Sequence, residues 1–293
     1  MPGSAPAPHP DAPDPVTRPT SGRTAFVLGG GGLLGAVEVG MLRALFEAGV
    51  RPHLVLGTSV GALNGLVAAS DPSPGAVDRL QELWHGIGES GTVYADGTLR
   101  QVRRVVRTGT HLHSVEPLRE RLEEQFGALT FADLAVEFQC CAASIERATE
   151  HWFATGPVVP AVLASAAVPG LLPPAEVDGE HFLDGGIVNS VPLDRAVRLG
   201  AERIFVLQVG RIDRPLAVPR RPWQVARVSF EIARRHRFTS QLASLPEGVE
   251  VHVLPAGGSR KDDSLLAYRD ASLVADRIAR AHEVSADFLR GVV

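Results

Sequence analysis

The sequence is poor in aromatic residues, in lysine and in long apolar runs, and it carries little net charge. Phenylalanine, tryptophan and tyrosine make up 5% of its 293 residues, which argues against a surface that stacks nucleic-acid bases. A formal net charge of −4 provides no basic field to attract nucleic acid. No stretch offers about 18 uninterrupted apolar residues, as a membrane span requires. We therefore predict a soluble, cytoplasmic protein with no nucleic-acid partner.

Cysteine is almost absent, and the two cysteines of the chain are neighbours, Cys140 and Cys141. Adjacent residues of a strand point to opposite faces, so we predict that both thiols stay reduced and pack as small apolar side chains. Two cysteines are too few for a metal site, and His111 and His113 lie in a loop that we expect to be exposed, without further ligands. The sequence predicts neither a metal nor a cofactor.

The first 23 residues are rich in proline and alanine and contain no apolar run. They lack the pattern of a signal peptide, and we predict a disordered tail over residues 1–23. Residues 24–293 are predicted to form one domain, because no linker divides them. Within it, residues 71–127 are predicted to be a mainly helical insertion, with helices over 76–87, 99–107 and 115–126. No feature of the sequence predicts an oligomeric state.

Strands and helices alternate at the start of this domain. Residues 24–28 and 53–56 form short apolar runs, while 33–48 and 60–69 have helical spacing. This order predicts parallel strands joined by right-handed crossovers, and therefore an α/β fold. Further along we predict a hairpin over 137–144 and 150–153, strands over 181–184, 203–209 and 251–254, and helices over 157–167, 193–199 and 270–288.

The sequence Gly-Thr-Ser-Val-Gly, from Gly57 to Gly61, fits the pattern G-x-S-x-G between a predicted strand and a predicted helix. Such a turn is sharp, and a glycine at each end leaves room for the neighbouring elements. The serine hydroxyl then projects from the carboxyl edge of the sheet, beside the positive end of the following helix. Ser59 is therefore the candidate nucleophile.

Four consecutive glycines, Gly29 to Gly32, and then Gly35 connect the first strand to the first helix. Uncovered N–H groups in such a loop suit an anion or an oxyanion. The stretch from Gly30 also satisfies G-x-G-x-x-G, but the second strand ends without the acidic residue that would hold a ribose. A phosphate-binding loop would need a lysine, which is missing here. We interpret Gly30, Gly31, Gly32 and Gly35 as an oxyanion-hole loop.

An acidic residue at a strand end, in Asp184-Gly185-Gly186, is the third chemical signal. We expect Asp184 to close a parallel strand at the carboxyl edge of the sheet, where α/β proteins collect their ligands. The ordinary α/β-hydrolase order of serine, acid and histidine fits poorly, because only one strand–helix unit precedes Ser59. A histidine base would have to come from a charged helix or a late strand, where the candidates are His236, His252 and His282.

The glycine loop, the Ser59 elbow and the Asp184 turn together resemble the patatin-like acyl hydrolases in order and spacing. Residues 164–173 and 189–192 are also similar to that family, and the resemblance covers about residues 24–210. It implies a three-layer α/β/α sandwich with a mainly parallel sheet. It also implies a Ser–Asp dyad without histidine or metal, in which Ser59 is the nucleophile, Asp184 is the base and the Gly30–Gly32 loop is the oxyanion hole. Leu34 departs from the family, which usually has a basic residue there.

The resemblance implies a substrate class, the ester bonds of phospholipids, lysophospholipids or neutral lipids. Two other functions stay open. One is a nucleotide- or phosphate-binding regulatory module that uses the glycine loop. The other is a catalytically silent family member that serves as an interaction protein.

Residues 223–242 alternate arginines with apolar side chains, a pattern that fits a helix on the core or a helix that contacts a lipid surface transiently. Because the net charge is acidic, we expect the core arrangement. In that arrangement Val225, Val228, Phe230 and Ile232 would face the core, and the arginines would face water.

Overall fold

The computed structural model describes residues 22–90, 111, 113–209, 215–258 and 273–293. The predicted tail up to residue 21 and the predicted helix over 99–107 lie outside the described residues. Arg23, which we assigned to the tail, belongs to the folded part. Its carbonyl oxygen accepts hydrogen bonds from the N–H groups of Glu202 and Arg203, and its side chain reaches Glu137.

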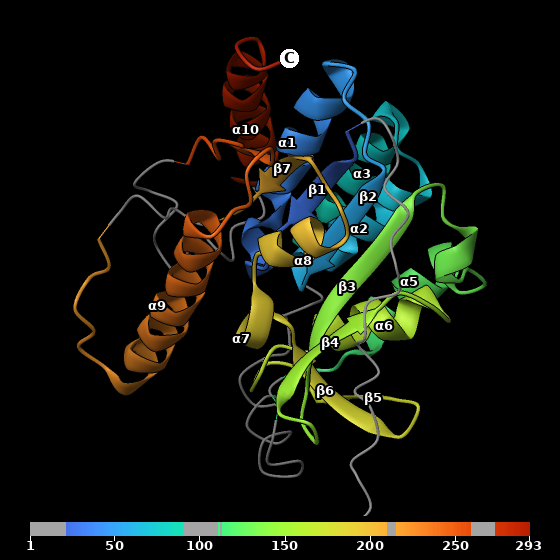
Figure 1. The fold of residues 1–293 in the computed structure, drawn as a ribbon. Helices are drawn as coiled ribbons and strands as arrows, with labels where there is room; N and C mark the ends of the chain where they lie inside the picture. Colours follow the sequence, from blue (N-terminus) through green and yellow to red (C-terminus); the bar gives the residue numbers. More distant parts are fainter. Residues whose placement is uncertain (1–21, 91–110, 112, 210–214, 259–272) are drawn as a thin grey trace, which may run out of the picture.

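An eight-stranded sheet forms the centre of the described structure, in the order β5-β6-β3-β2-β1-β7-β8, with β4 paired to β3 (Figure 1). The strands are β1 (Thr24–Leu28), β2 (Leu54–Thr58), β3 (Glu137–Ser144), β4 (Thr149–Phe153), β5 (Ala175–Val177), β6 (Glu180–Asp184), β7 (Arg203–Leu207) and β8 (Glu250–Val253). From β3 to β8 the five neighbouring strands β3, β2, β1, β7 and β8 are parallel, as the alternation of strands and helices predicts. The predicted hairpin of β3 and β4 is confirmed.

Helices cover both faces of this sheet, which confirms the three-layer α/β/α arrangement (Figure 1). The helices are α1 (Ala36–Glu47), α2 (Val60–Ser70), α3 (Pro74–Ser90), α5 (Glu116–Phe126), α6 (Val158–Ser165), α7 (Gly186–Asn189), α8 (Leu193–Arg198), α9 (Pro222–Ala243) and α10 (Leu273–Leu289), with short 3₁₀ turns η1 (Gly32–Gly35) and η2 (Phe131–Asp133). One face carries α1, α2, α3, α5, α6 and α10, and the other carries α8 and α9.

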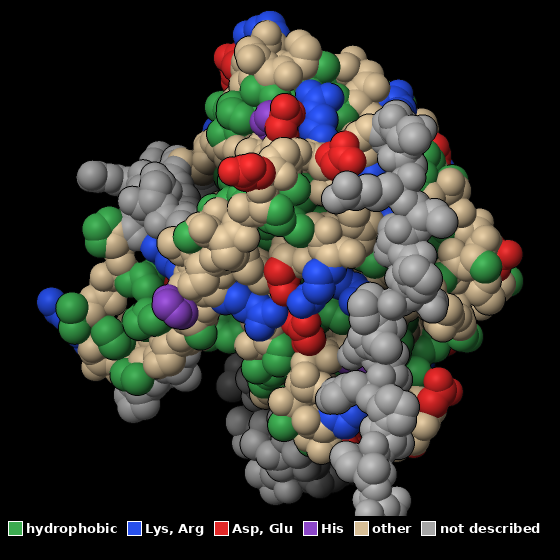
Figure 2. Space-filling model, viewed as in Figure 1, with side chains coloured by type: hydrophobic (Ala, Val, Ile, Leu, Met, Phe, Trp, Pro, Cys, Tyr) green, Lys and Arg blue, Asp and Glu red, His purple; other side chains and the backbone are tan. Residues whose placement is uncertain are grey.

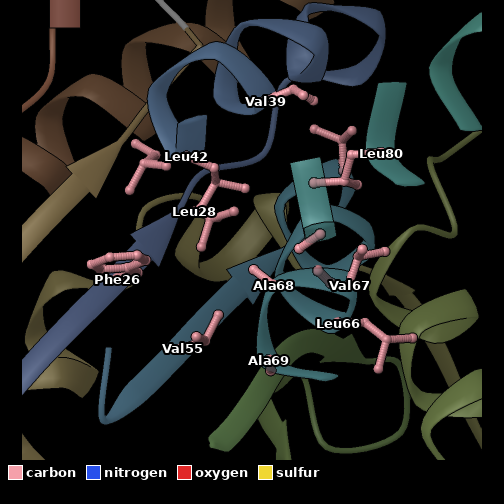
Figure 3. Close-up of a cluster of buried hydrophobic side chains, with 14 of the residues drawn as sticks. Phe26, Leu28, Val39, Leu42, Val55, Leu66, Val67, Ala68, Ala69 and Leu80 are labelled. Carbon is pink, nitrogen blue, oxygen red and sulfur yellow. The ribbon is translucent and has the colours of Figure 1, made fainter. Parts of the chain in front are cut away.

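Successive side chains of the central strands divide between two apolar cores. Phe26 and Leu28 of β1 pack with the helices of the larger core, as Figure 3 shows, whereas Ala25 and Val27 point to the opposite face. The same alternation runs through β7. Strands buried on both faces read as continuous apolar runs, and this explains why the sequence shows no alternation between polar and apolar residues here.

Helix α1 is buried nearly all around, although its sequence predicts a single apolar face. The reason is α10, which packs across it on the side away from the sheet. Gly40 permits this crossing, because a Cβ there would stand 2.3 Å from the carbonyl oxygen of Ile278 and 2.7 Å from the backbone nitrogen of His282.

The strand that carries Asp184 runs in the direction opposite to the one we predicted. β6 is antiparallel to β3, and it also pairs in antiparallel fashion with β5, which the sequence did not predict. The connection from β4 to β6 is a short helix followed by a hairpin, so β6 returns beside β3 without a crossover over the sheet. A four-residue apolar run does not specify its direction, and only the pairing does.

Helix α9 is oriented opposite to the expectation. Val225, Phe230 and Ile232 are exposed, whereas Arg234 is buried. The burial of Arg234 is compensated by its ion pair with Glu231, at 2.6 Å. The helical spacing of apolar residues defines an arc of the helix but does not specify whether that arc faces the sheet.

His113 is buried rather than exposed, and its N–H donates a hydrogen bond to the carbonyl oxygen of Leu171 at 2.8 Å. The expectation of an exposed loop at this position was therefore wrong. Cys140 and Cys141 are both buried and free, as predicted.

Candidate active site

Ser59 and Asp184 lie at the ends of two strands that flank β3. The last residue of β2, Thr58, is paired with Cys141, and β6 pairs Asp184 with the next residue of β3, Ala142. Because β2 is parallel to β3 and β6 is antiparallel to it, the two strands reach neighbouring positions of β3 from opposite directions. Pairing with β3 thus brings together two residues that are 125 positions apart in the sequence.

The turn at Ser59 has the geometry of a nucleophile elbow. Ser59 has a φ of 57° and a ψ of −123°, a conformation that non-glycine residues rarely adopt. The glycines on both sides are needed for packing: a Cβ on Gly57 would stand 2.4 Å from the carbonyl oxygen of Gly61, and one on Gly61 would stand 2.3 Å from that of Leu28. Close backbone packing therefore fixes the elbow between the strand and α2.

A buried serine that the sequence analysis did not single out holds this strained turn. The N–H of Ser59 donates to the Ser165 hydroxyl oxygen at 2.9 Å, and that hydroxyl donates to the carbonyl oxygen of Cys141 at 2.6 Å. The carbonyl oxygen of Ser165 also accepts a hydrogen bond from the N–H of Gly185. Ser165 thereby connects the elbow, β3 and the acid turn. Its sequence neighbourhood, which resembles the family, was the available signal.

The Ser59 hydroxyl donates a 2.5 Å hydrogen bond directly to Oδ2 of Asp184. The other carboxylate oxygen, Oδ1, accepts a hydrogen bond from the N–H of Gly186 at 2.7 Å. Burial raises the pKa of Asp184 from 3.8 to about 6, although both of these hydrogen bonds favour its charged form. A carboxylate with this pKa is a stronger base than an exposed aspartate, and it is held at the hydroxyl from which it would take a proton.

The glycine loop lies beside Ser59, but its N–H groups are not all available. The N–H of Gly29 donates to the carbonyl oxygen of Leu207, and the N–H of Gly30 donates to that of Ser190, each at 2.9 Å. Gly30 therefore contributes no free donor in this structure. Within the described residues, the N–H groups of Gly31 and Gly32 have no acceptor.

Close contacts require three of the predicted glycines of the loop and of the acid turn, whereas Gly32 has open space around it and a positive φ of 58°. A Cβ on Gly31 would stand 1.7 Å from Cγ2 of Val209, and one on Gly35 would stand 2.2 Å from Cγ2 of Val60. On the other side of the site, a Cβ on Gly185 would stand 2.1 Å from the carbonyl oxygen of Cys141. These positions allow the loop and the turn to pack against the elbow.

A buried polar cluster under the loop is a second feature that the sequence analysis missed. Nδ2 of Asn64 donates to the carbonyl oxygen of Gly35 at 3.0 Å and to Oε2 of Glu38 at 2.7 Å, and Trp84 Nε1 donates to Oδ1 of Asn64 at 3.0 Å. Burial raises the pKa of Glu38, which favours its neutral form. The cluster ties α1, α2 and α3 to the last glycine of the loop. Each of these three side chains lies within a predicted helix and belongs to no motif, so the sequence did not single it out.

The candidate histidines lie elsewhere. His282 on α10 contacts Glu47 of α1 through its Nε2 at 2.6 Å. His252 on β8 lies against Phe205, with ring centroids 5.0 Å apart, and His236 is on the exposed part of α9. The direct bond between Ser59 and Asp184 leaves no imidazole between them. The described part of the chain contains no group of three or more metal-ligating side chains.

With this geometry in view, similarity to known proteins identifies the family. The sequence profile described as patatin-like phospholipase matches residues 26–197. Lysophospholipase nte1 of Aspergillus terreus is 31% identical over 199 residues, which are 68% of this chain and 13% of that protein. Neuropathy target esterase sws of Drosophila melanogaster is 30% identical over 66% of this chain and 13% of its own length. The chain belongs to the patatin-like phospholipase family.

The relatives are much longer than the matched region, since this chain spans only 13% of the length of nte1 and of sws. The fold is also similar to that of a solved structure, VipD from Legionella pneumophila. That comparison gives a TM-score of 0.53 at 15% sequence identity, and it covers 92% of this chain and 67% of VipD. It supports the mixed α/β fold with a mainly parallel sheet.

The role of Ser165 gives a first prediction. We expect Ser165→Ala to lower the free energy of unfolding by about 1–3 kcal/mol, because the buried N–H of Ser59 loses its acceptor. Urea denaturation would measure this change. Ser70→Ala is the matched control, since the half-buried Ser70 hydroxyl donates only to the carbonyl oxygen of Val67 in its own helix. An equal loss of stability in both variants would contradict the special role of Ser165.

Proposed function

We propose that this chain is a serine acyl hydrolase that cleaves ester bonds of lipids, with Ser59 as nucleophile and Asp184 as base. The observation that carries the proposal is the 2.5 Å bond between the Ser59 hydroxyl and a buried carboxylate, formed at a strained elbow. Membership of the patatin-like phospholipase family and relatives named lysophospholipase and esterase support the reaction class.

The acylation step follows from the positions of these two groups. As the Ser59 oxygen attacks the ester carbonyl carbon, its proton passes to Asp184, and the electron pair of the C=O bond moves to the carbonyl oxygen. The tetrahedral intermediate then collapses to an acyl-serine, and the departing alkoxide takes the proton from Asp184. Water subsequently attacks the carbonyl carbon of the acyl-serine while Asp184 accepts its proton. When this second intermediate collapses, the bond from the carbon to Ser59 Oγ breaks and Asp184 returns the proton to that oxygen, which releases the fatty acid and restores Ser59 and Asp184.

Two sources of positive potential are available for the charge that develops on the carbonyl oxygen. One is the pair of N–H groups of Gly31 and Gly32, which lack an acceptor among the described residues. The other is the N-terminus of α2, whose first residue directly follows Ser59. Both are backbone donors, so Leu34 in place of a basic residue leaves them intact. Donors of this kind stabilise the tetrahedral intermediate more than the ester.

We further propose that the enzyme reaches its substrate at a lipid surface through α9. The exposed fractions of Val225, Phe230 and Ile232 on this helix are 50%, 43% and 55%. Figure 2 shows apolar side chains at the left of the view, over the region of α9 and the segment that leads into it. A soluble protein normally turns such side chains inward. Val225 and Ile232 are seven residues apart and therefore share one face of α9, and this α9 ridge is typical of an interaction surface.

A different side of α9, which carries Phe230, faces the catalytic turn. Ile187 of α7, two residues after Gly185, is 44% exposed, and α7 packs against α9. Phe230 lies close enough that a Cβ on Gly186 would stand 3.2 Å from its ring. Arg220 and Arg221 are exposed just before α9 and would complement anionic head groups. A lipid surface fits these features better than a second protein copy, since the apolar area is only one helix wide.

The dyad gives the second prediction. Ser59→Ala and Asp184→Asn should each lower kcat on p-nitrophenyl butyrate by several orders of magnitude, because each removes one half of a single catalytic unit. Labelling by a fluorophosphonate should be lost in Ser59→Ala. The matched controls are His252→Ala and His282→Ala, which should keep activity within about tenfold, since neither imidazole touches the dyad. Activity that survives in Asp184→Asn but not in a histidine variant would contradict the dyad.

A wild-type protein that neither reacts with the fluorophosphonate nor hydrolyses any ester would favour the two other functions, a phosphate-binding module or a silent interaction protein. The same labelling therefore separates the hydrolase from both alternatives, because only an activated serine is phosphonylated at a measurable rate.

The pH dependence gives the third prediction. Asp184 must be ionised to accept a proton, and its pKa is raised to about 6. We therefore expect kcat/KM to be constant above about pH 7 and to fall about tenfold per unit below about pH 6, the acid limb of a single base. Thermal melts at each pH would show that the protein stays folded over this range. A profile that stays flat down to about pH 5 would contradict Asp184 as the base with this raised pKa.

The α9 ridge gives the fourth prediction. The double variant Val225→Ser, Ile232→Ser should bind vesicles of phosphatidylcholine and phosphatidylglycerol about tenfold less tightly, because two half-exposed aliphatic side chains no longer enter the lipid. Hydrolysis of a short soluble ester should not change. Ile145→Ser is the matched control, since Ile145 is 45% exposed and follows β3, away from α9. Equal vesicle binding by the wild type, the double variant and the control would contradict a lipid surface. So would a wild type that is a dimer in solution and becomes a monomer in the double variant, because α9 would then be an interface between two copies of the chain.

A further inference from the structure

Ser190 carries a buried hydroxyl for which the dyad has no use. It directly follows α7 and is 4% exposed, and its Oγ has no hydrogen-bond partner among the described residues. Buried hydroxyls are normally paired, so an exception calls for an explanation such as a ligand that supplies the missing bond. In the sequence, only its place within residues 189–192, which resemble the family, marked this position.

The backbone around Ser190 is fixed to both halves of the site. The carbonyl oxygen of Ser190 accepts the N–H of Gly30 at 2.9 Å, which attaches it to the glycine loop. The carbonyl oxygen of the preceding residue, Asn189, accepts the hydroxyl of Thr58 at 2.8 Å, which attaches it to the strand before Ser59. The Ser190 hydroxyl is therefore held in a defined position relative to the nucleophile.

Gly30 keeps open a small space between Ser190 and Ser59. A Cβ on Gly30 would stand 3.2 Å from Oγ of Ser190, 3.4 Å from Cβ of Ser59 and 3.6 Å from the carbonyl oxygen of Thr58. For a methyl group, 3.2 Å from Oγ is a tight contact, whereas for an oxygen atom it is close to hydrogen-bond distance. The space beside Gly30 thus suits an oxygen that accepts a hydrogen bond from Ser190.

The tetrahedral intermediate places an oxygen in this neighbourhood. Its oxyanion is bonded to the carbon that Ser59 Oγ has attacked, so only three covalent bonds separate it from Cβ of Ser59. It must therefore lie within a few ångströms of that Cβ, as the space beside Gly30 does. The ester oxygen carries less charge before the attack, so a donor here acts mainly on the intermediate.

We propose that the Ser190 hydroxyl donates a hydrogen bond to the oxyanion of the tetrahedral intermediate. The proposal rests on the hydrolase function proposed above and names one further catalytic residue for it. The carbonyl oxygen of Ser190 accepts the hydrogen bond of the Gly30 N–H, so this N–H is not available to the oxyanion. The Ser190 hydroxyl takes its place as a donor. The oxyanion hole then consists of the Ser190 hydroxyl together with the N–H groups of Gly31 and Gly32.

The experiment compares Ser190→Ala, Ser190→Cys and Ser190→Thr with the wild type. Loss of one oxyanion donor costs about 10²–10³ in kcat in a well-studied protease, so we expect kcat on p-nitrophenyl butyrate to fall about 10- to 100-fold in the alanine variant, with KM within about threefold. The rate of phosphonylation by a fluorophosphonate should fall by a similar factor. Cysteine, which fills the same space with a weak donor, should also lose rate, whereas threonine keeps the hydroxyl and should restore part of it.

The controls separate a catalytic role from a structural one. Ser240→Ala removes an exposed hydroxyl on α9 and should leave all rates unchanged. The pH at which kcat/KM falls should not move in the Ser190 variants, because Asp184 keeps both of its hydrogen bonds. If Ser190→Ala does not fold, as thermal melting would reveal, the cysteine variant carries the test.

The outcomes distinguish this proposal from the one on which it rests. Normal labelling of the wild type, with rates in Ser190→Ala or Ser190→Cys within twofold of it, would overturn the role of Ser190 alone. A rise in KM at constant kcat would also overturn it, because it would indicate a contact made equally in the bound ester. A wild type that is neither labelled nor active would overturn the hydrolase function and the role of Ser190 with it.

Discussion

The hydrogen bond between Ser59 and Asp184 depends on β3, the strand that separates their two strands. β2 reaches β3 at Cys141 in the parallel direction, and β6 reaches it at Ala142 in the antiparallel direction. Both chains therefore leave the sheet beside neighbouring residues of β3. This brings the carboxylate into direct contact with the hydroxyl, without an imidazole between them.

A direct bond of this kind places an ionisable carboxyl inside the protein, and folding is less favourable as a result. The pKa of Asp184 rises from 3.8 to about 6, so the folded state loses stability relative to the unfolded chain as the pH rises through that interval. The surroundings limit this loss through the hydrogen bonds from Ser59 and Gly186. Ser165 and Asn64 also favour the folded state. Their side chains form hydrogen bonds with backbone groups of the elbow and of the loop that would otherwise be buried without partners.

Helix α9 combines a charged inner side with an apolar outer side. Arg237 reaches Glu150 of β4 at 2.9 Å, and Figure 2 shows acidic and basic side chains together near the centre of this face. Phe238 is the large apolar side chain that α9 buries in the smaller core. The helix is thus held to the body chiefly by polar contacts, which leaves its aliphatic side chains available for the lipid-surface role proposed above. No helix in the described ranges is long and apolar enough to cross a bilayer.

Most strands and helices of this protein, and the chemical character of its site, could be predicted from local patterns in the sequence. Apolar periodicity placed β1, β2, α2 and the hairpin of β3 and β4 to within a few residues, because strands buried on both faces and helices bounded by glycine have strong local signals. The three glycine-rich turns were also evident, because sharp turns and close backbone contacts admit few other residues. Ser59 and Asp184 stand out for the same reason.

Which of these elements pack together, and in what direction, could be read only from the folded structure. Three features depend on residues far away in the sequence: the antiparallel pairing of β6, the outward face of α9 and the burial of His113. A local sequence pattern contains no information about such partners. The same holds for Ser165, Asn64 and Ser190, which are ordinary polar residues of helices and turns until folding surrounds them. A hydroxyl gains its role here from the donor or acceptor that packing brings within hydrogen-bond distance, and packing is a property of the whole chain.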